Sequence, residues 1–125
     1  ISVKDRDKAD AAALARRLAG LGFKLLATTG TARHLKASGL KVKRINKVLQ
    51  GPPHCEGAIV TGKVQLVINT TEGAQAIADS FSLRRAALIN HVPYYTTVAG
   101  SRAAVQAIAA LERGALEVAT LQSYT

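Results

Sequence analysis

The chain has 125 residues, a formal net charge of +9 and a composition that is 48% hydrophobic but only 4% aromatic. This length fits one domain, 1–125, whose core must be filled mainly by Ala, Val, Leu and Ile. No apolar run approaches the roughly 20 residues of a membrane span, and no signal peptide is evident, so we expect a cytoplasmic protein with no membrane contact. The single cysteine, Cys55, excludes an internal disulfide.

The sequence opens in mid-strand without a starting methionine, which suggests a domain from a much longer chain. The strong positive charge raises nucleic acid as a partner. However, the basic residues are spread over several segments, and few aromatic side chains are available for base stacking. The densest basic stretch, 41–47, alternates charged residues with Val and Ile, as does a strand with one solvated face. We therefore expect no nucleic-acid partner.

Short apolar runs alternate with helical patterns along the chain. Strands are expected at 1–3, 23–27, 41–45, 64–68 and 93–96, and the tail, 116–125, is expected to add a short strand. Helices are expected between Asp7 and Gly20 and at 31–38, 54–61, 73–80, 83–90 and 101–112. This alternation predicts an α/β fold with three layers: a five-stranded, mainly parallel sheet with helices on both faces.

The stretch 25–32 combines the end of a buried strand, a turn of small hydroxylated residues and the start of a helix. A helix N-terminus offers N–H groups without intrahelical partners and a positive dipole, so an anion fits there. Thr28, Thr29 and Thr31 add hydroxyl groups, and Gly30 allows close approach of a ligand. The alternative is an ordinary turn in which the threonines only cap the helix.

Polar residues follow several other predicted strands. The carboxyl ends of parallel strands share one edge of a sheet, and ligands of α/β proteins bind there. Lysines provide point charges for a phosphate, whereas hydroxyl and amide groups provide oriented hydrogen bonds. The sequence thus predicts a phosphate site at this edge, formed by Lys8, the stretch 28–31, Lys47 and the stretch 69–71. The alternative is that Lys8 and Lys47 are ordinary surface lysines and Asn69 is a turn residue.

Other chemistries lack the residues that they need. There is no G-x-G-x-x-G for a dinucleotide and no Gly-Lys-Ser or Gly-Lys-Thr for a P-loop. His54 and Cys55 are adjacent, but a four-ligand set is missing, so we expect no metal site. Cys55 as a nucleophile would need an oriented base that the sequence does not identify.

Five motifs together resemble the methylglyoxal-synthase-like superfamily, and most closely the regulatory domain at the C-terminal end of carbamoyl-phosphate synthetase large subunits. In order, they are Asp7-Lys8, Ala27-Thr28-Thr29-Gly30-Thr31-Ala32, Asn46-Lys47-Val48, Gly51-Pro52-Pro53-His54 and Ile68-Asn69-Thr70-Thr71. The likeness extends from Ser2 to the Tyr95-Thr96-Thr97 stretch.

The resemblance implies a rim site for a nucleotide effector such as UMP or IMP. Lys8, Thr28, Thr31, Lys47, Asn69 and Thr71 match the phosphate-binding and neighbouring positions, and Asp79 matches a position near the ribose. In such enzymes the effector tunes the synthesis of carbamoyl phosphate for pyrimidine and arginine biosynthesis. The rest of the large subunit, which uses ATP with Mg or Mn, and a glutaminase small subunit carry out the catalysis, so this domain needs no cofactor of its own.

Two departures from relatives bear on function. A free-standing methylglyoxal synthase is the alternative, but the corresponding loop here, Gly51-Pro52-Pro53-His54-Cys55-Glu56, is shorter and lacks the Gly-Gly-Asp of that enzyme. Glu56 is a carboxylate near that position, although an acid at a helix start has a simpler explanation. In bacterial relatives activated by ornithine, an acidic residue precedes a Thr-Thr pair at the domain boundary. Here Tyr95 precedes Thr96, which argues against ornithine activation.

Overall fold

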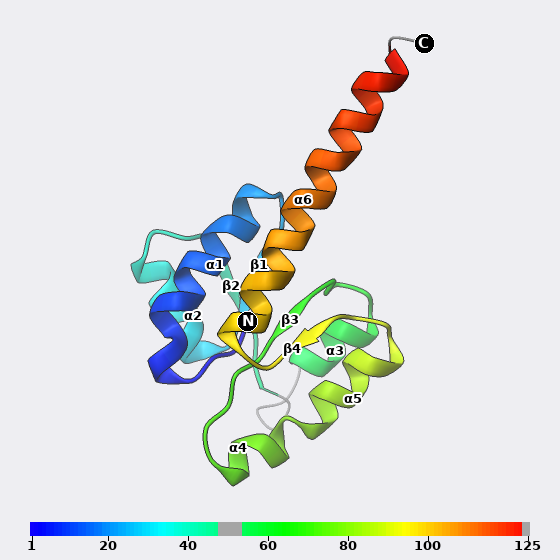
Figure 1. Ribbon diagram of the computed structural model, residues 1–125. Coiled ribbons are helices and arrows are strands. Elements are labelled where there is room, and N and C mark those ends of the chain that lie inside the picture. The colour runs from blue at the N-terminus through cyan, green and yellow to red at the C-terminus, as the bar shows by residue number, and fades with distance from the viewer. Residues whose placement is uncertain (48–53, 124–125) are drawn as a thin grey trace.

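The structure is a computed structural model that describes residues 1–47 and 54–123, with side chains to residue 112. The expected proline-containing turn at 51–53, and Val48 before it, lie outside the described residues. A 3₁₀ turn, η1, and ten helices and strands follow one another along the described chain (Figure 1). In order, they are η1 (Asp5–Asp7), α1 (Lys8–Gly20), β1 (Leu25–Ala27), α2 (Thr29–Ala37), β2 (Val42–Arg44), α3 (Cys55–Val60), β3 (Val67–Ile68), α4 (Ala74–Asp79), α5 (Phe81–Ile89), β4 (Tyr94–Tyr95) and α6 (Val98–Ser123).

Two parallel strand pairs, β1 with β2 and β3 with β4, are joined through the first residues of the chain. The backbone nitrogen of Ile1 donates to the carbonyl of Leu26 (2.7 Å), and that of Ser2 donates to Ile68 (2.9 Å). Ser2 and Asn69 form an isolated parallel bridge. Residues 1–3 therefore lie between β1 and β3. The chain leaves residues 1–3 through α1 toward β1, whereas it leaves β3 through α4 and α5 toward β4, which is the geometry of a topological switch point.

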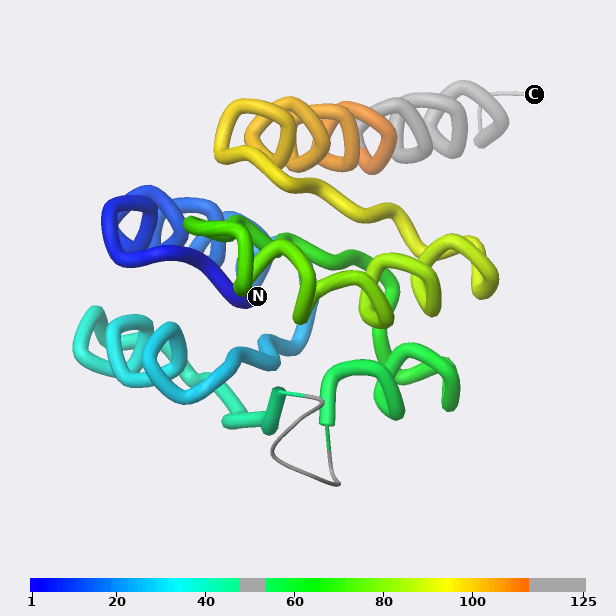
Figure 2. The backbone as a smooth tube through the Cα atoms, turned by 90° about the horizontal axis from the view of Figure 1, so that it is seen from below, coloured from blue at the N-terminus to red at the C-terminus, as the bar shows by residue number. Residues whose placement is uncertain are grey.

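The helices cover both faces of this parallel arrangement. Helix α1 contacts both α2 and α6 on one face, and α3 contacts α5 on the other (Figures 1 and 2). Each face has its own apolar cluster, as the period of two in a strand requires. Leu25, Ala27 and Ile68 belong to the cluster under α1 and α2, whereas Val67 belongs to the cluster under α5.

The α/β class, the parallel pairing and the helices on both faces are confirmed. The expected strand at 1–3 is present as a central segment with a single bridge. The expected strand in the tail is wrong, because α6 runs from Val98 to Ser123 without a break. Its sequence contains no proline and only one glycine after residue 100, so nothing local ends the helix near residue 112.

Thr31 links α2 to the central segment. Its hydroxyl oxygen accepts a hydrogen bond from the backbone N–H of Val3 (3.1 Å), and its side chain is buried, with the residue 2% exposed. The same position was expected to bind phosphate, and the structure shows that its hydroxyl makes a structural hydrogen bond.

Thr31→Val is expected to lower the free energy of unfolding by about 1–3 kcal/mol, because the buried N–H of Val3 loses its acceptor. Thermal denaturation followed by circular dichroism would measure this loss. Thr31→Ser keeps the acceptor and serves as the control. Equal melting temperatures for the wild type and Thr31→Val would show that the bond contributes nothing.

Candidate functional site

The first turn of α2 lies at the carboxyl edge of the strands. Thr28 occupies the N-cap position but makes no side-chain capping bond. Its hydroxyl instead donates to the Ser2 side-chain oxygen (2.9 Å), and the residue is 4% exposed. The simple alternative, in which Thr28 caps the helix, therefore does not describe this turn.

Lys8 lies against this same turn. A Cβ atom built on Gly30 would be 3.7 Å from the Lys8 ammonium nitrogen, an ordinary contact distance, so the lysine side chain lies directly beside residue 30. The Lys8 ammonium also forms a hydrogen-bonded ion pair with Asp5. The hydrogen bond and charge of Lys8 hold the pKa of Asp5 below its usual value. Lys8 thus joins the N-terminus of α1 to the N-terminus of α2.

Arg44, at the end of β2, is a second cation beside α2 that the sequence analysis missed. Its Nη1 atom donates to the Thr29 hydroxyl oxygen (3.3 Å) and to the Asn46 side-chain oxygen (3.0 Å). Thr29 is the first residue of α2. The signal was present in the alternation of 41–45, which puts Val42 and Arg44 on the same face of the strand.

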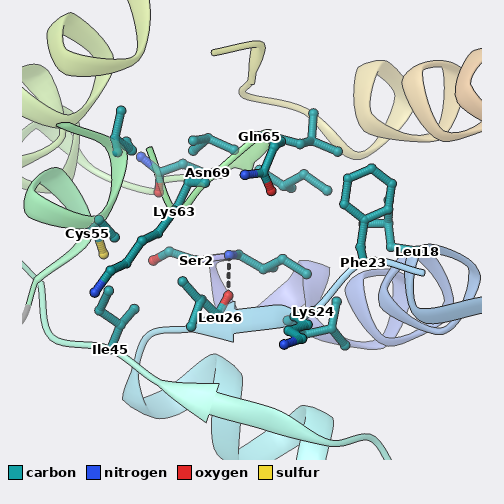
Figure 3. A pocket seen from close by; sticks show the side chains of 18 of the residues that line it. Ser2, Leu18, Phe23, Lys24, Leu26, Ile45, Cys55, Lys63, Gln65 and Asn69 are labelled. Atoms are coloured by element: carbon teal, nitrogen blue, oxygen red, sulfur yellow. Dashed lines mark hydrogen bonds between the residues drawn. The ribbon is translucent and has the colours of Figure 1, made fainter. Parts of the chain in front are cut away.

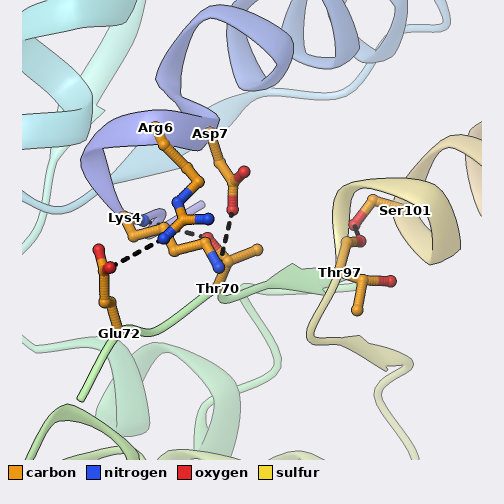
Figure 4. Close-up of polar contacts among 7 residues, drawn as sticks. All are labelled: Lys4, Arg6, Asp7, Thr70, Glu72, Thr97 and Ser101. Carbon is orange, nitrogen blue, oxygen red and sulfur yellow. Dashed lines mark hydrogen bonds and ion pairs between the residues drawn. The ribbon is translucent and has the colours of Figure 1, made fainter.

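The segment after the central strand is tied to the segment after β3 (Figure 4). The backbone N–H of Lys4 donates to the Thr70 hydroxyl oxygen (3.0 Å), and Arg6 forms an ion pair with Glu72 (2.9 Å). The Lys4 ammonium also lies 3.8 Å from an oxygen of Asp7, and the Asp7 side chain makes no capping bond to α1. These contacts hold the start of α1 close to the Asn69–Thr71 stretch.

The polar residues after β3 divide between the two sides of the strand. Asn69 is buried and its amide donates to the Tyr94 hydroxyl (2.6 Å). Thr70 faces Lys4, as described above, and Thr71, the predicted phosphate contact, is half-buried immediately beyond it. Asn69 is therefore at the predicted edge, with its side-chain amide engaged by β4.

Two predicted site residues lie farther along the edge or away from it. Lys47 is exposed and follows β2. Its positive charge lowers the pKa of the Cys55 thiol, an effect smaller than the rise caused by burial. Asp79 is exposed at the end of α4, where its carboxylate accepts a hydrogen bond from Gln75 on the same helix (2.8 Å). The structure therefore brings Lys8, Thr28 and Thr31 together around α2, and it places Asp79 on a separate helix.

The predicted interdomain region lies at the start of α6. The carbonyl of Tyr95 accepts from the Asn69 backbone N–H (2.9 Å), so Tyr95 is part of the sheet. Thr96 is exposed just after it. The Thr97 hydroxyl oxygen then accepts a hydrogen bond from the backbone N–H of Gly100 (3.0 Å), in the first turn of α6.

A mostly apolar pocket of about 90 Å³ lies beside residues 1 and 2, between Phe23–Leu26 and Gln65–Ile68 (Figure 3). Its volume is far below the roughly 300–1,000 Å³ of typical small-molecule sites. Lys8, Thr31 and Arg44 do not line it. The cationic edge at α2, rather than this pocket, is therefore the candidate site.

His54 and Cys55 have structural partners. The His54 ring accepts from the backbone N–H of Gly57 (3.0 Å) and so caps α3. The Cys55 thiol donates to the Asn46 carbonyl (3.2 Å), and burial raises the pKa of this thiol. Over residues 1–47 and 54–112, whose side chains the structure describes, no three His, Cys, Asp or Glu side chains are grouped to hold a metal ion. The described helices include none long and apolar enough to cross a membrane.

Comparison with known proteins identifies the family. The model of the MGS-like domain matches residues 10–96. The chain belongs to the MGS-like domain family. Carbamoyl phosphate synthase large chains from Mesorhizobium japonicum and Rhizobium meliloti are 55% and 56% identical to this MGS-like domain over 99% of its length. The domain spans only 11% of the length of those two relatives.

A solved structure agrees with the fold of this MGS-like domain. Methylglyoxal synthase from Elizabethkingia anophelis superposes with a TM-score of 0.67, covering 83% of this chain and 74% of that one. At 20% sequence identity, this likeness establishes the architecture alone. The family model over residues 10–96 and the carbamoyl phosphate synthase relatives confirm the expected resemblance to the methylglyoxal-synthase-like superfamily.

The Cys55 thiol is expected to react more slowly with iodoacetamide at pH 7.5 than a free cysteine does, because burial raises its pKa and leaves less thiolate. The alkylation rate should keep rising above pH 8.5, which is about the pKa of a free thiol, because more thiolate forms as the pH increases. Mass spectrometry of alkylated protein against pH measures both features. A rate equal to that of a cysteine-containing peptide would contradict this assignment.

Proposed function

We propose that this MGS-like domain is an effector-binding domain of a carbamoyl phosphate synthase large chain, and that it binds a nucleoside monophosphate such as UMP or IMP through its phosphate. The position of Lys8 carries the proposal. Its ammonium lies against the first turn of α2, whose N-cap residue makes no side-chain cap. A phosphate there meets a lysine charge, backbone N–H groups and the positive end of a nine-residue helix.

The neighbouring residues support an anion at this edge. Thr71 is half-buried beside the Lys4–Thr70 contact, and Lys47 follows β2 on the same edge. Thr28 and Thr31 hold the turn through Ser2 and Val3. In this proposal Lys8, Lys47 and Thr71 contact the phosphate, Thr28, Thr31 and Asn69 shape its surroundings, and Asp79 provides a ribose contact.

The role of the whole protein follows from its relatives. We propose that the parent chain is an ATP-dependent ligase that uses Mg or Mn and works in the cytoplasm with a glutaminase small subunit. Effector binding here would regulate carbamoyl phosphate synthesis for pyrimidine and arginine biosynthesis. The domain itself would have no catalytic residue and no cofactor, and Tyr95 and Thr96 would lie toward a neighbouring domain.

The alternative is a methylglyoxal synthase acting on dihydroxyacetone phosphate, and it shares the fold. Its expected carboxylate base, Glu56, lies in the first turn of α3, where an acidic side chain is favoured by the helix dipole alone. Formation of methylglyoxal that is abolished by Glu56→Gln would favour this alternative.

The chain is expected to bind UMP or IMP at least tenfold more tightly than the matching nucleoside, because charge-assisted hydrogen bonds to the phosphate supply most of the affinity. Isothermal titration calorimetry with UMP, IMP, uridine, inosine and inorganic phosphate measures the difference. Equal affinities for UMP and uridine would refute phosphate recognition.

Lys8→Ala is expected to weaken phosphate binding by about 10- to 100-fold, the value of one charge-assisted hydrogen bond of about 1.5–3 kcal/mol. Lys36→Ala is the control, because Lys36 is exposed in the last turn of the same helix, α2. Equal losses in the two variants would indicate diffuse attraction to the positive chain, which salt removes.

Asp5→Asn is expected to raise phosphate affinity by about 1.5- to 5-fold, because an exposed carboxylate no longer competes for Lys8. The pKa of Asp5 is lowered, so its carboxylate is charged and competes with phosphate for Lys8 above that pKa. The competition is lost as the pH falls through the pKa and the carboxylate is protonated. Asp10→Asn removes the same charge from an exposed site beside Arg102 and is the matched control. Titration calorimetry at pH 7.5 compares them, and a similar gain in both would assign the effect to net charge.

A further inference from the structure

We propose that Arg44 is a second phosphate ligand of this site, holding the anion from the side of α2 that faces β2. The inference rests on the proposed function and adds a residue that the matching motifs do not contain. It predicts that the site recognises phosphate by a planar guanidinium as well as by the point charge of Lys8.

The position of Arg44 is fixed by two acceptors. Its Nη1 atom donates to the Thr29 hydroxyl and to the Asn46 side-chain oxygen, so the guanidinium lies over the first residue of α2. Lys8 reaches the next residue of the same turn, Gly30. The two cations therefore approach the same helix N-terminus, one from β2 and the other from α1.

The remaining donors of Arg44 suit a phosphate. A guanidinium has five N–H donors, and Nη1 carries two of them. The three donors on Nη2 and Nε make no hydrogen bond within the part of the chain that the structure describes. Two adjacent N–H groups of a guanidinium match two oxygens of a phosphate, which a lysine cannot do.

Electrostatic balance points the same way. The Lys8 charge is paired with Asp5, whereas both acceptors of Arg44 are neutral groups, a threonine hydroxyl and an asparagine amide. Arg44 is exposed, so it keeps its charge available to a ligand from solvent. Arg44 is therefore the cation at this turn whose described partners carry no negative charge.

The test compares Arg44→Ala with Lys43→Ala. Both variants remove one positive charge from the same strand, but successive strand residues point to opposite faces, so Lys43 points away from α2. Calorimetric titration with inorganic phosphate and with UMP should show a loss of at least about tenfold for Arg44→Ala and less than twofold for Lys43→Ala. Arg44→Lys, which keeps the charge but loses the planar fork, should recover only part of the affinity.

Thr29→Val tests the positioning of Arg44. It removes one of the two acceptors of Nη1 and should weaken phosphate binding two- to fivefold in the wild-type background but not in Arg44→Ala, giving a coupled double-mutant cycle. Circular dichroism and the melting temperature show that each variant is folded.

Each result decides the proposal. Equal effects of Arg44→Ala and Lys43→Ala would overturn it, and so would a loss for UMP without a loss for inorganic phosphate. A loss with Lys8→Ala but none with Arg44→Ala would overturn the role of Arg44 and leave the proposed function intact. Absence of phosphate and UMP binding in the wild type would overturn both.

Discussion

The hydrogen bonding of residues 1–4 is the constraint on which the rest of the structure depends. Ile1 donates a hydrogen bond to β1, and Ser2 donates one to β3. The backbone N–H of Val3 donates to the Thr31 hydroxyl, and that of Lys4 donates to the Thr70 hydroxyl. This segment joins the two strand pairs into one parallel arrangement. It also sets the point from which the crossovers leave in opposite directions, and so it creates the edge where α1, α2 and the loop after β3 meet.

Much of the fold could be predicted from sequence, because alternating short apolar runs and helical patterns are local signals. The strand predicted in the tail was wrong for a physical reason. Residues 116–125 contain apolar and β-branched residues typical of a strand, but no helix-breaking residue separates them from the helix that begins at Val98. Predicted strands were longer than those observed. The period of two shows which residues face the core but not how far hydrogen-bonded pairing extends.

The candidate site was only partly predictable. The threonine turn and Lys8 follow strands, and the switch-point rule brings such residues to one edge without knowledge of the contacts. The individual partners could not be predicted, since they depend on side-chain directions across elements. The hydroxyl of Thr28 turns to Ser2 rather than to its own helix, and Arg44 turns toward Thr29. Arg44 was hidden among several basic residues whose alternation is equally typical of a solvated strand.

Thr31 lies in the first turn of α2 and also bonds to the central segment, and this has an evolutionary consequence. Its hydroxyl supports the central segment through Val3, so selection for folding alone retains it, even in a domain that no longer binds an effector. Thr70 is under the same pressure through Lys4. Lys8 and Arg44 have no comparable share in the core. If they bind phosphate as proposed, only ligand binding selects for them, so among related domains the threonines would indicate common ancestry and the two cations beside α2 would indicate a ligand site.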